Sequence, residues 1–563
     1  MRRRQFLKRT AGGALGAGLA GSSLLIKGCG LGKEYDLMII GGTVFDGSGS
    51  PGVRADIAVK GGKIAAIGAS LDSSKAREVI EAKGMAVAPG FIDPHTHTDI
   101  HLLVNPKAES KIRQGVTTEV GGNCGGSCVP VADKDFEERK ELLKERFDLD
   151  LTWNDITGFF GQLEKRGSAV NYAMLVGNGT LRNMVIGPYD RPATEEELTR
   201  MKRLVTENMQ AGAVGLSSGL EYAPSNFAST EELVELCREV ARYGGKYATH
   251  MRSEDDLLLE AIDEAVTIAR DAQVSLQISH FKACYRRNWD KLDAAFEKVE
   301  QAQKELGNVL CDRYSYHAYS TGLSMFFPMW AREGETEDFI NRLKDESLDS
   351  RIREYVMERE EMIGSWDNVL ISSVHTDGNK HVVGKTVLAA AKEAGKPGYE
   401  FARDLIIEEE NRVSMIGFAM SEDNLKRVLA HPRVVVGSDG NSLADYGPLS
   451  EGIPHPRSYG TFPRVLGRFV REEQIMPLET AVRKMSGLTA DQFGFTGRGY
   501  LREGYFADAV VFNPDTVIDR ATWSEPHTYP AGIDYVVVNG RIVIREGEHT
   551  GELPGMILKQ TAV

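Results

Sequence analysis

Two histidines separated by one residue, His95 and His97, directly follow a short apolar stretch that ends at Ile92. In an extended strand, residues i and i+2 point to the same side, so both imidazoles can face one metal ion. Asp93 and Asp99 flank the pair and are candidate ligands or partners that orient the rings. Such a pair is also common as a polar surface feature, so the rest of the chain must decide between the two interpretations.

Other potential metal ligands and acid–base groups also come immediately after apolar runs. They are Cys124, His250, His280 and Asp439. Each of them alone would more often be a core or loop residue. With His95 and His97 they make six candidates that follow apolar runs, and such a set is difficult to attribute to chance. His375 also ends an apolar run and is a weaker candidate. We expect the remaining histidines to be structural or on the surface, among them His101, His317, His381, His431, His527 and His549.

Cys124 lies in a glycine-rich segment, Gly121–Cys128. Glycines allow a backbone to approach an ion closely, which favours a thiolate ligand at Cys124. A disulfide between Cys124 and Cys128 is the alternative. The cysteines that follow Cys29 are irregularly spaced, so they do not indicate a disulfide framework.

The elements that position these residues alternate in type along the middle of the chain. Apolar runs lie near residues 171–177, 213–217, 246–249, 274–279, 308–312 and 433–437, and helix-periodic stretches separate them. With the runs before His95 and before Gly121 they make eight strands, which predicts an α/β fold with a (β/α)8 TIM-like barrel over residues 89–489. A ninth run at 369–374 implies an insertion, which we place near 285–370. In such a barrel, residues just past the strand ends line the active site.

Both ends of the chain have a different, all-β texture. Short apolar runs with glycine turns occupy residues 35–88, and similar runs recur within 490–563, where Asn539-Gly540 is a strong hairpin signal. We therefore predict one small β-sandwich domain built from both chain ends.

The overall charge favours a small-molecule partner. The 563 residues carry a net charge of −14, and no basic patch with interleaved aromatic residues stands out, so nucleic acid is not expected to bind.

The first 28 residues have the composition of an export signal. A basic segment containing Arg3-Arg4-Gln5-Phe6-Leu7-Lys8 precedes a glycine-interrupted apolar run from Ala11 to Ile26, in the pattern of a twin-arginine signal peptide. A permanent N-terminal anchor is the alternative. Cys29 is a candidate for lipidation, in competition with simple cleavage. We expect an exported protein, either periplasmic or anchored on the outer side of the cytoplasmic membrane.

Several short motifs together resemble the amidohydrolase superfamily, and specifically the D-aminoacylases, which deacylate N-acyl-D-amino acids. The motifs are Gly-Phe-Ile-Asp-x-His-Thr-His, Gly-Asn-Cys-Gly, Thr-His-x-Arg, Ser-His-x-Lys, Asp-x-Tyr and Gly-Ser-Asp-Gly. The similarity extends from about Tyr35 to about Gly547, and as a set the motifs are highly specific. One departure is Ser315, where family members often carry proline.

The resemblance implies a zinc site. Cys124, His250 and His280 would hold a tightly bound ion, while His95 and His97 would serve a second, weaker site that Cys124 bridges. Zinc suits such mixed thiolate and imidazole ligands. Asp439 would be the catalytic acid–base group. Side chains placed by the family motifs to bind the substrate are Lys282, Tyr314, Ser320, Arg457 and, as an assisting group, Arg252.

The implied reaction is hydrolysis of an N-acyl-D-amino acid to a carboxylate and a free D-amino acid. A hydantoinase- or dihydroorotase-like cyclic-amide hydrolase and a metallo-dipeptidase on the same barrel are alternatives. We find no lysine at the end of an early strand to serve as the carboxylated bridging ligand of the cyclic-amide enzymes, which is weak evidence against that class. A noncatalytic surface lipoprotein is a further alternative, but it would not need a proton shuttle at Asp439.

Overall fold

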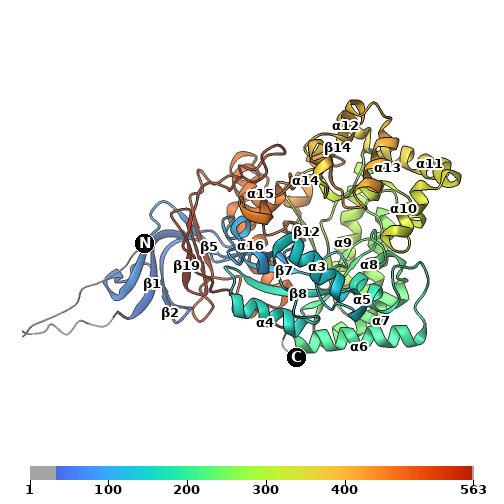
Figure 1. Ribbon diagram of the computed structural model, residues 1–563. Helices are drawn as coiled ribbons and strands as arrows, with labels where there is room; N and C mark the ends of the chain where they lie inside the picture. The colour runs from blue at the N-terminus through green and yellow to red at the C-terminus, as the bar shows by residue number, and fades with distance from the viewer. Residues whose placement is uncertain (1–32, 561–563) are drawn as a thin grey trace, which may run out of the picture.

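The computed structural model describes residues 33–560, so the predicted signal at 1–28 and the candidate lipidation site at Cys29 lie outside the described residues. At its centre is an eight-stranded parallel sheet, whose strands coincide with the eight predicted apolar runs (Figure 1). The strands are β6 (Phe91–Asp93), β7 (Val116–Gly121), β8 (Asn171–Gly177), β9 (Gly215–Gly219), β10 (Lys246–His250), β11 (Ser275–Ile278), β12 (Val309–Arg313) and β16 (Val434–Val436). The predicted (β/α)8 barrel is confirmed.

The barrel closes where its first and last strands meet, just beyond β6 and β16. A parallel bridge joins Thr96 to Gly440 there. The Asp439 amide donates to the His95 carbonyl at 2.8 Å, and the His97 amide donates to the Gly440 carbonyl at 3.0 Å. Closure therefore places two segments that are more than three hundred residues apart in the chain side by side.

A buried lysine reinforces this closure. Lys111, in the short helix α2 (Glu109–Ile112), is fully buried. Its ammonium donates to Asp93 Oδ2 at 2.8 Å and to the Ser438 hydroxyl. Asp93 Oδ1 in turn accepts from the Ser438 amide at 2.9 Å. One ion pair thus joins the ends of β6 and β16.

Amphipathic helices cover the barrel, and α6 (Glu195–Ala211) shows why they form where they do. Thr194 caps its first turn in a reciprocal capping box with Glu197, and the left-handed Gly212 ends it. Met201, Val205 and Met209 recur at helical spacing and are buried. The other helices that flank the barrel strands are α3 (Phe136–Phe147), α4 (Ile156–Arg166), α5 (Asn178–Val185), α7 (Thr230–Ala241), α8 (Leu258–Ala272), α9 (Leu292–Leu306), α14 (Glu422–Ala430), α15 (Arg457–Arg464), α16 (Leu478–Met485) and α17 (Gly487–Phe493).

Both chain ends contribute to one nine-stranded sheet beside the barrel (Figure 1). Its strands are β1 (Tyr35–Val44), β2 (Val53–Lys60), β3 (Lys63–Gly68), β4 (Ala76–Glu81), β5 (Ala86–Pro89), β17 (Ala509–Phe512), β18 (Ile533–Val538), β19 (Arg541–Arg545) and β20 (Glu548–His549). The two ends meet where β5 pairs antiparallel with β17. The sheet branches at β1, and Ile39, Val511 and Val537 share one buried cluster, so its two halves enclose a common core.

An inserted segment between β12 and β16 forms a separate lobe at the upper right of Figure 1. It holds a three-stranded antiparallel sheet and its own buried core. The elements are β13 (Tyr319–Gly322), α10 (Thr336–Lys344), α11 (Glu346–Ile363), β14 (Val369–Ser373), α12 (Val387–Glu393), α13 (Gly398–Glu408) and β15 (Ser414–Gly417).

The predicted insertion boundaries near 285–370 are wrong at both ends. Residues 292–306 form α9, which packs on the barrel strand β12, so they are barrel rather than insertion. The apolar run at 369–374 is β14, which pairs with β15 inside the lobe, and the lobe therefore continues well past 370. Short buried strands of a small sheet and of a barrel have the same composition, so the sequence did not separate them.

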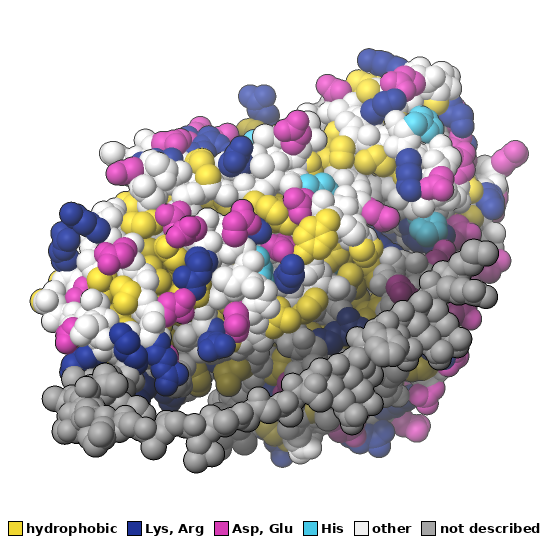
Figure 2. Space-filling model, turned by 60° about the vertical axis from the view of Figure 1, so that its left-hand side comes forward, with side chains coloured by type: hydrophobic (Ala, Val, Ile, Leu, Met, Phe, Trp, Pro, Cys, Tyr) yellow, Lys and Arg dark blue, Asp and Glu magenta, His cyan; other side chains and the backbone are white. Residues whose placement is uncertain are grey.

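On the face drawn in Figure 2, basic and acidic side chains are interspersed among small apolar areas. Among residues 33–560, no helix has both the length and the apolar character required to cross a membrane.

Candidate metal centre and active site

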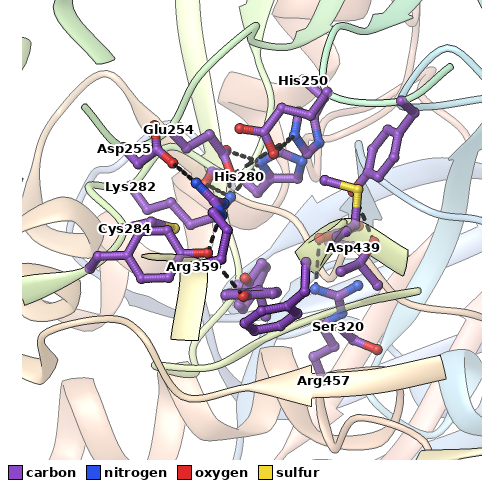
Figure 3. Close-up of a pocket in the computed structure, with 18 residues that line it drawn as sticks. His250, Glu254, Asp255, His280, Lys282, Cys284, Ser320, Arg359, Asp439 and Arg457 are labelled. Atoms are coloured by element: carbon purple, nitrogen blue, oxygen red, sulfur yellow. Dashed lines mark hydrogen bonds and ion pairs between the residues drawn. The ribbon is translucent and has the colours of Figure 1, made fainter. Parts of the chain in front are cut away.

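The predicted ligands converge at the carboxyl-terminal mouth of the barrel. His95 and His97 follow β6, Cys124 follows β7, His250 ends β10 and His280 follows β11. Cys124 Sγ lies 3.3 Å from His95 Nε2 and 3.6 Å from His280 Nε2. The rings of His250 and His280 are 4.4 Å apart between centroids. Figure 3 shows these two rings on one side of a pocket, with Asp439 and Arg457 opposite.

Among the described residues, the potential ligand atoms fall into three groups, two of which share one sulfur. His95, His97, Cys124 and Asp439 make the first group, Cys124, His250 and His280 make the second, and Glu221, His250 and Glu254 make the third, each with its donor atoms within 4.8 Å of one another. A Cys124 thiolate would be available to an ion held by either of the first two groups. Sulfur and imidazole nitrogen are donors that zinc prefers, so the residues present fit this metal.

Unusual backbone conformations aim these side chains. Cys124, His280 and Asp439 have left-handed φ values of 51°, 37° and 50°. Non-glycine residues in this region cost of order 1–3 kcal/mol each and tend to gather at functional sites. Each bend occurs just past a strand end, where it turns the side chain across the mouth of the barrel.

The electrostatics favour the ligand forms of the thiol and the carboxyl. Burial alone would raise the pKa of the Cys124 thiol, but the rings of His95, His250 and His280 outweigh it and hold this pKa well below its usual range. Burial would likewise raise the pKa of Asp439, but Arg457 and His95 hold it well below the ordinary value. The nitrogen Nδ1 of His250 is buried without a hydrogen-bond partner among residues 33–560, as a nitrogen awaiting a ligand would be.

Two acidic residues that the sequence analysis did not assign orient the histidines. Asp312, the fourth residue of β12, places Oδ1 3.1 Å from His95 Nδ1 and 2.7 Å from the His280 amide nitrogen. Glu254 Oε1 lies 2.7 Å from His280 Nδ1. The Asp312 contact favours the His95 tautomer that leaves Nε2 free towards Cys124, and the Glu254 contact orients the His280 ring in the same sense. Asp312 begins the Asp-x-Tyr motif, so a signal was present, whereas Glu254 follows no distinctive pattern.

The predicted substrate-binding residues line the pocket, except one. Arg457 Nη1 lies 2.7 Å from Asp439 Oδ2, and its guanidinium stacks 4.8 Å from the Tyr314 ring. The Tyr314 hydroxyl is buried without a hydrogen-bond partner in the described part of the chain. The Lys282 ammonium is paired with Glu254 and lies 2.8 Å from His280 Nδ1. Ser320 lines the same pocket.

The structure does not bring Arg252 or His375 to the site. The Arg252 guanidinium makes a two-point contact with Glu264 at 2.9 and 2.8 Å and donates to the Asn226 carbonyl. The predicted assisting role of Arg252 in substrate binding is therefore corrected to a structural one. His375 is exposed on the inserted lobe, where its amide donates to Glu409. The alternative disulfide is not formed, because Cys124 and Cys128 are both free thiols.

We call the cavity in Figure 3 the inner pocket; it borders His250, His280, Asp439 and Arg457. The inserted lobe supplies another part of its wall through residues that sequence reasoning missed. They are Tyr319, Met325, Phe326 and Arg359. The Arg359 guanidinium contacts Asp255 Oδ2 at 2.8 Å, so the Asp255 carboxylate balances the positive charge of Arg359 within the pocket wall.

His455 was also missed, although it shapes the site. It is buried, its Nδ1 accepts from the Arg457 amide at 3.0 Å, and its Nε2 contacts the Ala318 carbonyl at 2.8 Å. It therefore holds the first turn of α15 against the loop that carries Tyr314. Ser315, which stands where relatives often carry proline, donates its hydroxyl to the Thr461 carbonyl in the same helix.

Comparisons with known proteins agree with this geometry. The sequence model described as the amidohydrolase family matches residues 78–323 and 359–544. The D-aminoacylase of Alcaligenes xylosoxydans xylosoxydans is 38% identical over 94% of this chain and 99% of its own. A zinc- and phosphonate-bound N-acyl-D-glutamate deacylase from Bordetella bronchiseptica superposes with a TM-score of 0.79 at 34% identity, covering 93% of this chain and 99% of that one. A D-aminoacylase structure described by its binuclear metal centre gives a TM-score of 0.78 at 36% identity, over 93% and 100% of the two chains. This chain belongs to the amidohydrolase family, and within it to the group of the D-aminoacylases.

Proposed function

We propose that this protein is a zinc-dependent N-acyl-D-amino-acid deacylase. The observation that carries the proposal is the pair of histidine-containing donor groups that share the Cys124 sulfur, with the Asp439 carboxylate facing them. Zinc held there would lower the pKa of a bound water towards ~7 and polarise the amide carbonyl.

Asp439 is placed to move the proton. Its Oδ1 lies 3.0 Å from His97 Nε2 and 3.3 Å from His95 Nε2, while Oδ2 is held by Arg457. The depressed pKa keeps the carboxylate ionised, which is the form that accepts a proton. Asp439 takes the proton of the attacking water and passes it to the amide nitrogen as the C–N bond breaks.

Cationic and hydroxyl groups in the inner pocket suit the substrate carboxylate. Arg457 carries a charge, and Tyr314 and Ser320 add hydroxyl donors beside it. Lys282 is balanced by Glu254, and Arg457 contacts Asp439 through Nη1. The five donors of a guanidinium leave Arg457 more capacity to bind a second carboxylate, so we assign the main charge contact to Arg457. The substrate carboxylate would lie in the inner pocket, on the side of the scissile amide that faces away from the mouth of the barrel.

The relatives support both the substrate class and the metal. The relatives at 35–38% identity are a D-aminoacylase and deacylases of N-acyl-D-aspartate and N-acyl-D-glutamate, one related structure was solved with zinc, and another is described with a binuclear centre. On this basis we propose one tight zinc site at Cys124, His250 and His280, with a second, weaker site at His95 and His97.

Metal analysis combined with a substrate panel tests the proposal. The panel contains matched N-acetyl-D- and N-acetyl-L-amino acids, hydantoins and dipeptides. We expect at least one zinc per chain and hydrolysis confined to the N-acetyl-D-amino acids. Turnover of hydantoins or dipeptides in their place would assign the chain to one of the alternative activities, and a zinc-loaded protein that hydrolyses none of them would contradict an enzymatic role on these substrates.

We also propose that the protein works outside the cytoplasm. The Arg3-Arg4-Gln5-Phe6-Leu7-Lys8 motif and the apolar run that follows it support twin-arginine export, and Cys29 is the candidate site of a lipid anchor.

A further inference from the structure

Two further cavities adjoin the inner pocket. The first, which we call the mouth, is bordered by His97, Cys124, His280 and Asp439, and therefore lies directly over the donor groups. The second, which we call the side cavity, opens from the same place in another direction and encloses about 420 Å³. Cys124, Gly126 and Tyr222 border both the mouth and the side cavity, so the two lie side by side.

The side cavity meets the proposed metal ligands only at Cys124, and its other walls have a distinct character. Its apolar lining comes from Val131, Ala132, Met184 and Pro224, and Asp135 and Arg139 add charge. A volume of this size falls in the ordinary range for organic ligands, whereas the inner pocket encloses only about 50 Å³.

We infer that the side cavity binds the acyl chain of the substrate and that the enzyme prefers N-acyl groups longer than acetyl. This inference rests on the proposed deacylase function. Of the carboxylate-binding groups, Arg457 and Ser320 border both the inner pocket and the mouth and Tyr314 borders the inner pocket, so the amino-acid half of the substrate extends from the mouth into the inner pocket. The scissile carbon lies at the mouth, beside Asp439 and the donor groups. The acyl half must leave that carbon away from the amino-acid half, and the side cavity is the adjoining space on the other side of the mouth that can receive it.

Gly126 forms the neck of this path. A Cβ added to Gly126 would meet nothing closer than the Asn123 carbonyl oxygen, at 3.9 Å, and its φ lies outside the left-handed range. A larger side chain can therefore project into open space between the mouth and the side cavity without backbone strain. Deeper in the cavity, Asn183 lies on its wall, is half-buried, and its side chain makes no hydrogen bond with the described residues.

A two-way substrate series tests the inference. One series keeps the D-amino acid and lengthens the acyl group from acetyl to octanoyl, and the other keeps acetyl and varies the D-side chain. For the unaltered protein we expect kcat/KM to rise by up to about fourfold for each buried methylene of the acyl chain until the cavity is filled. A flat or falling acyl series in a protein that hydrolyses N-acetyl-D-amino acids would overturn the inference while leaving the proposed function intact.

Blocking variants locate the effect. Gly126→Leu should collapse the octanoyl-to-acetyl ratio of kcat/KM, and Gly126→Ala should keep it. Asn183→Trp against Asn183→Ala repeats the comparison at a second position, with zinc content and circular dichroism measured for all four. If the bulky variants change the preference among D-side chains rather than among acyl chains, the two halves of the substrate are assigned the wrong way round. Absence of hydrolysis of every N-acyl-D-amino acid by the zinc-loaded, unaltered protein would instead contradict the proposed function itself.

Discussion

At the scale of single residues, Cys124 connects the two donor groups, so its substitution separates metal binding from folding. We expect Cys124→Ser to lose most bound zinc with the fold retained, because a hydroxyl is a far poorer zinc ligand than a thiolate. Elemental analysis and circular dichroism measure the two properties. Cys128→Ser is the matched control, since Cys128 is a free buried thiol outside both groups. Full zinc retention in the Cys124 variant would refute the ligand assignment.

A variant of Asp439 tests whether proton transfer can be separated from metal binding. Asp439→Asn keeps the size of the side chain but cannot accept the proton of water, so we expect kcat to fall by ~10²–10⁴-fold. The zinc held by Cys124, His250 and His280 should remain. Asp445→Asn, at an exposed carboxylate that contacts Tyr529, should keep full kcat. Loss of the tightly bound zinc together with activity would make Asp439 a ligand of that ion instead of a shuttle.

The sequence analysis assigned both Arg457 and Arg252 to substrate binding, but we expect their variants to behave differently. Arg457→Gln removes a charge from the inner pocket, and a charge-assisted hydrogen bond contributes about 1.5–3 kcal/mol, so kcat/KM should fall by about 10- to 100-fold or more. Arg252→Gln removes a contact with Glu264 outside the pocket and should leave KM unchanged. Steady-state kinetics on one N-acetyl-D-amino acid compares them. A raised KM for the Arg252 variant would restore that residue to the site.

At the scale of elements, the barrel depends on how its first and last strands are joined. Lys111→Met leaves the Asp93 carboxylate buried without its cation, and breaking a buried pair from one side typically costs about 3–5 kcal/mol. We expect a clearly lower melting temperature. Because Asp93 precedes His95 and Ser438 precedes Asp439, zinc affinity should fall as well.

Lys107→Met is the matched control for this variant. Lys107 is half-exposed, and its ammonium lies 3.9 Å from Glu109, an arrangement that contributes about 0–1 kcal/mol. Equal melting temperatures for the two variants would show that the Lys111 pair does not stabilise the closure.

At the scale of the whole molecule, three parts have separate tasks. The barrel supplies the donor groups, and the inserted lobe forms part of the wall of the inner pocket. The terminal β domain joins the two chain ends through β5 and β17. Because β6, which precedes His95, and β16, which precedes Asp439, are far apart in sequence, the site exists only when the whole barrel has closed. A protein that must bind its metal in a closed barrel is well suited to export in the folded state.

The export proposal is tested on the intact chain. Changing Arg3 and Arg4 together to Lys should stop export and leave active, zinc-loaded protein in the cytoplasm, because the twin-arginine pair is the part of the signal that is read. Cell fractionation with activity measurement follows the protein. Changing Arg2 and Arg9 to Lys is the control, which retains the pair and the same charge. Continued export of the first variant would contradict twin-arginine targeting.

The sequence by itself determined the barrel and most of the candidate site. Continuous apolar runs and period-3.6 patterns both reflect local burial, which is why all eight strands were found. The site residues were found because each one comes directly after a buried strand, and in a parallel barrel all such positions meet at one face. His95, His97, Cys124, His250 and His280 follow this rule, as does Asp439.

Only the tertiary structure decided the rest, because it depends on contacts between distant segments. The limits of the inserted lobe follow from which strands pair, and pairing is not encoded in the composition of a short run. Arg252 and Lys282 follow their histidines at the same spacing, yet Arg252 turns to Glu264 and Lys282 into the pocket. Glu254 contacts His280, and His455 contacts the Ala318 carbonyl 137 residues away, so no local pattern marked either one.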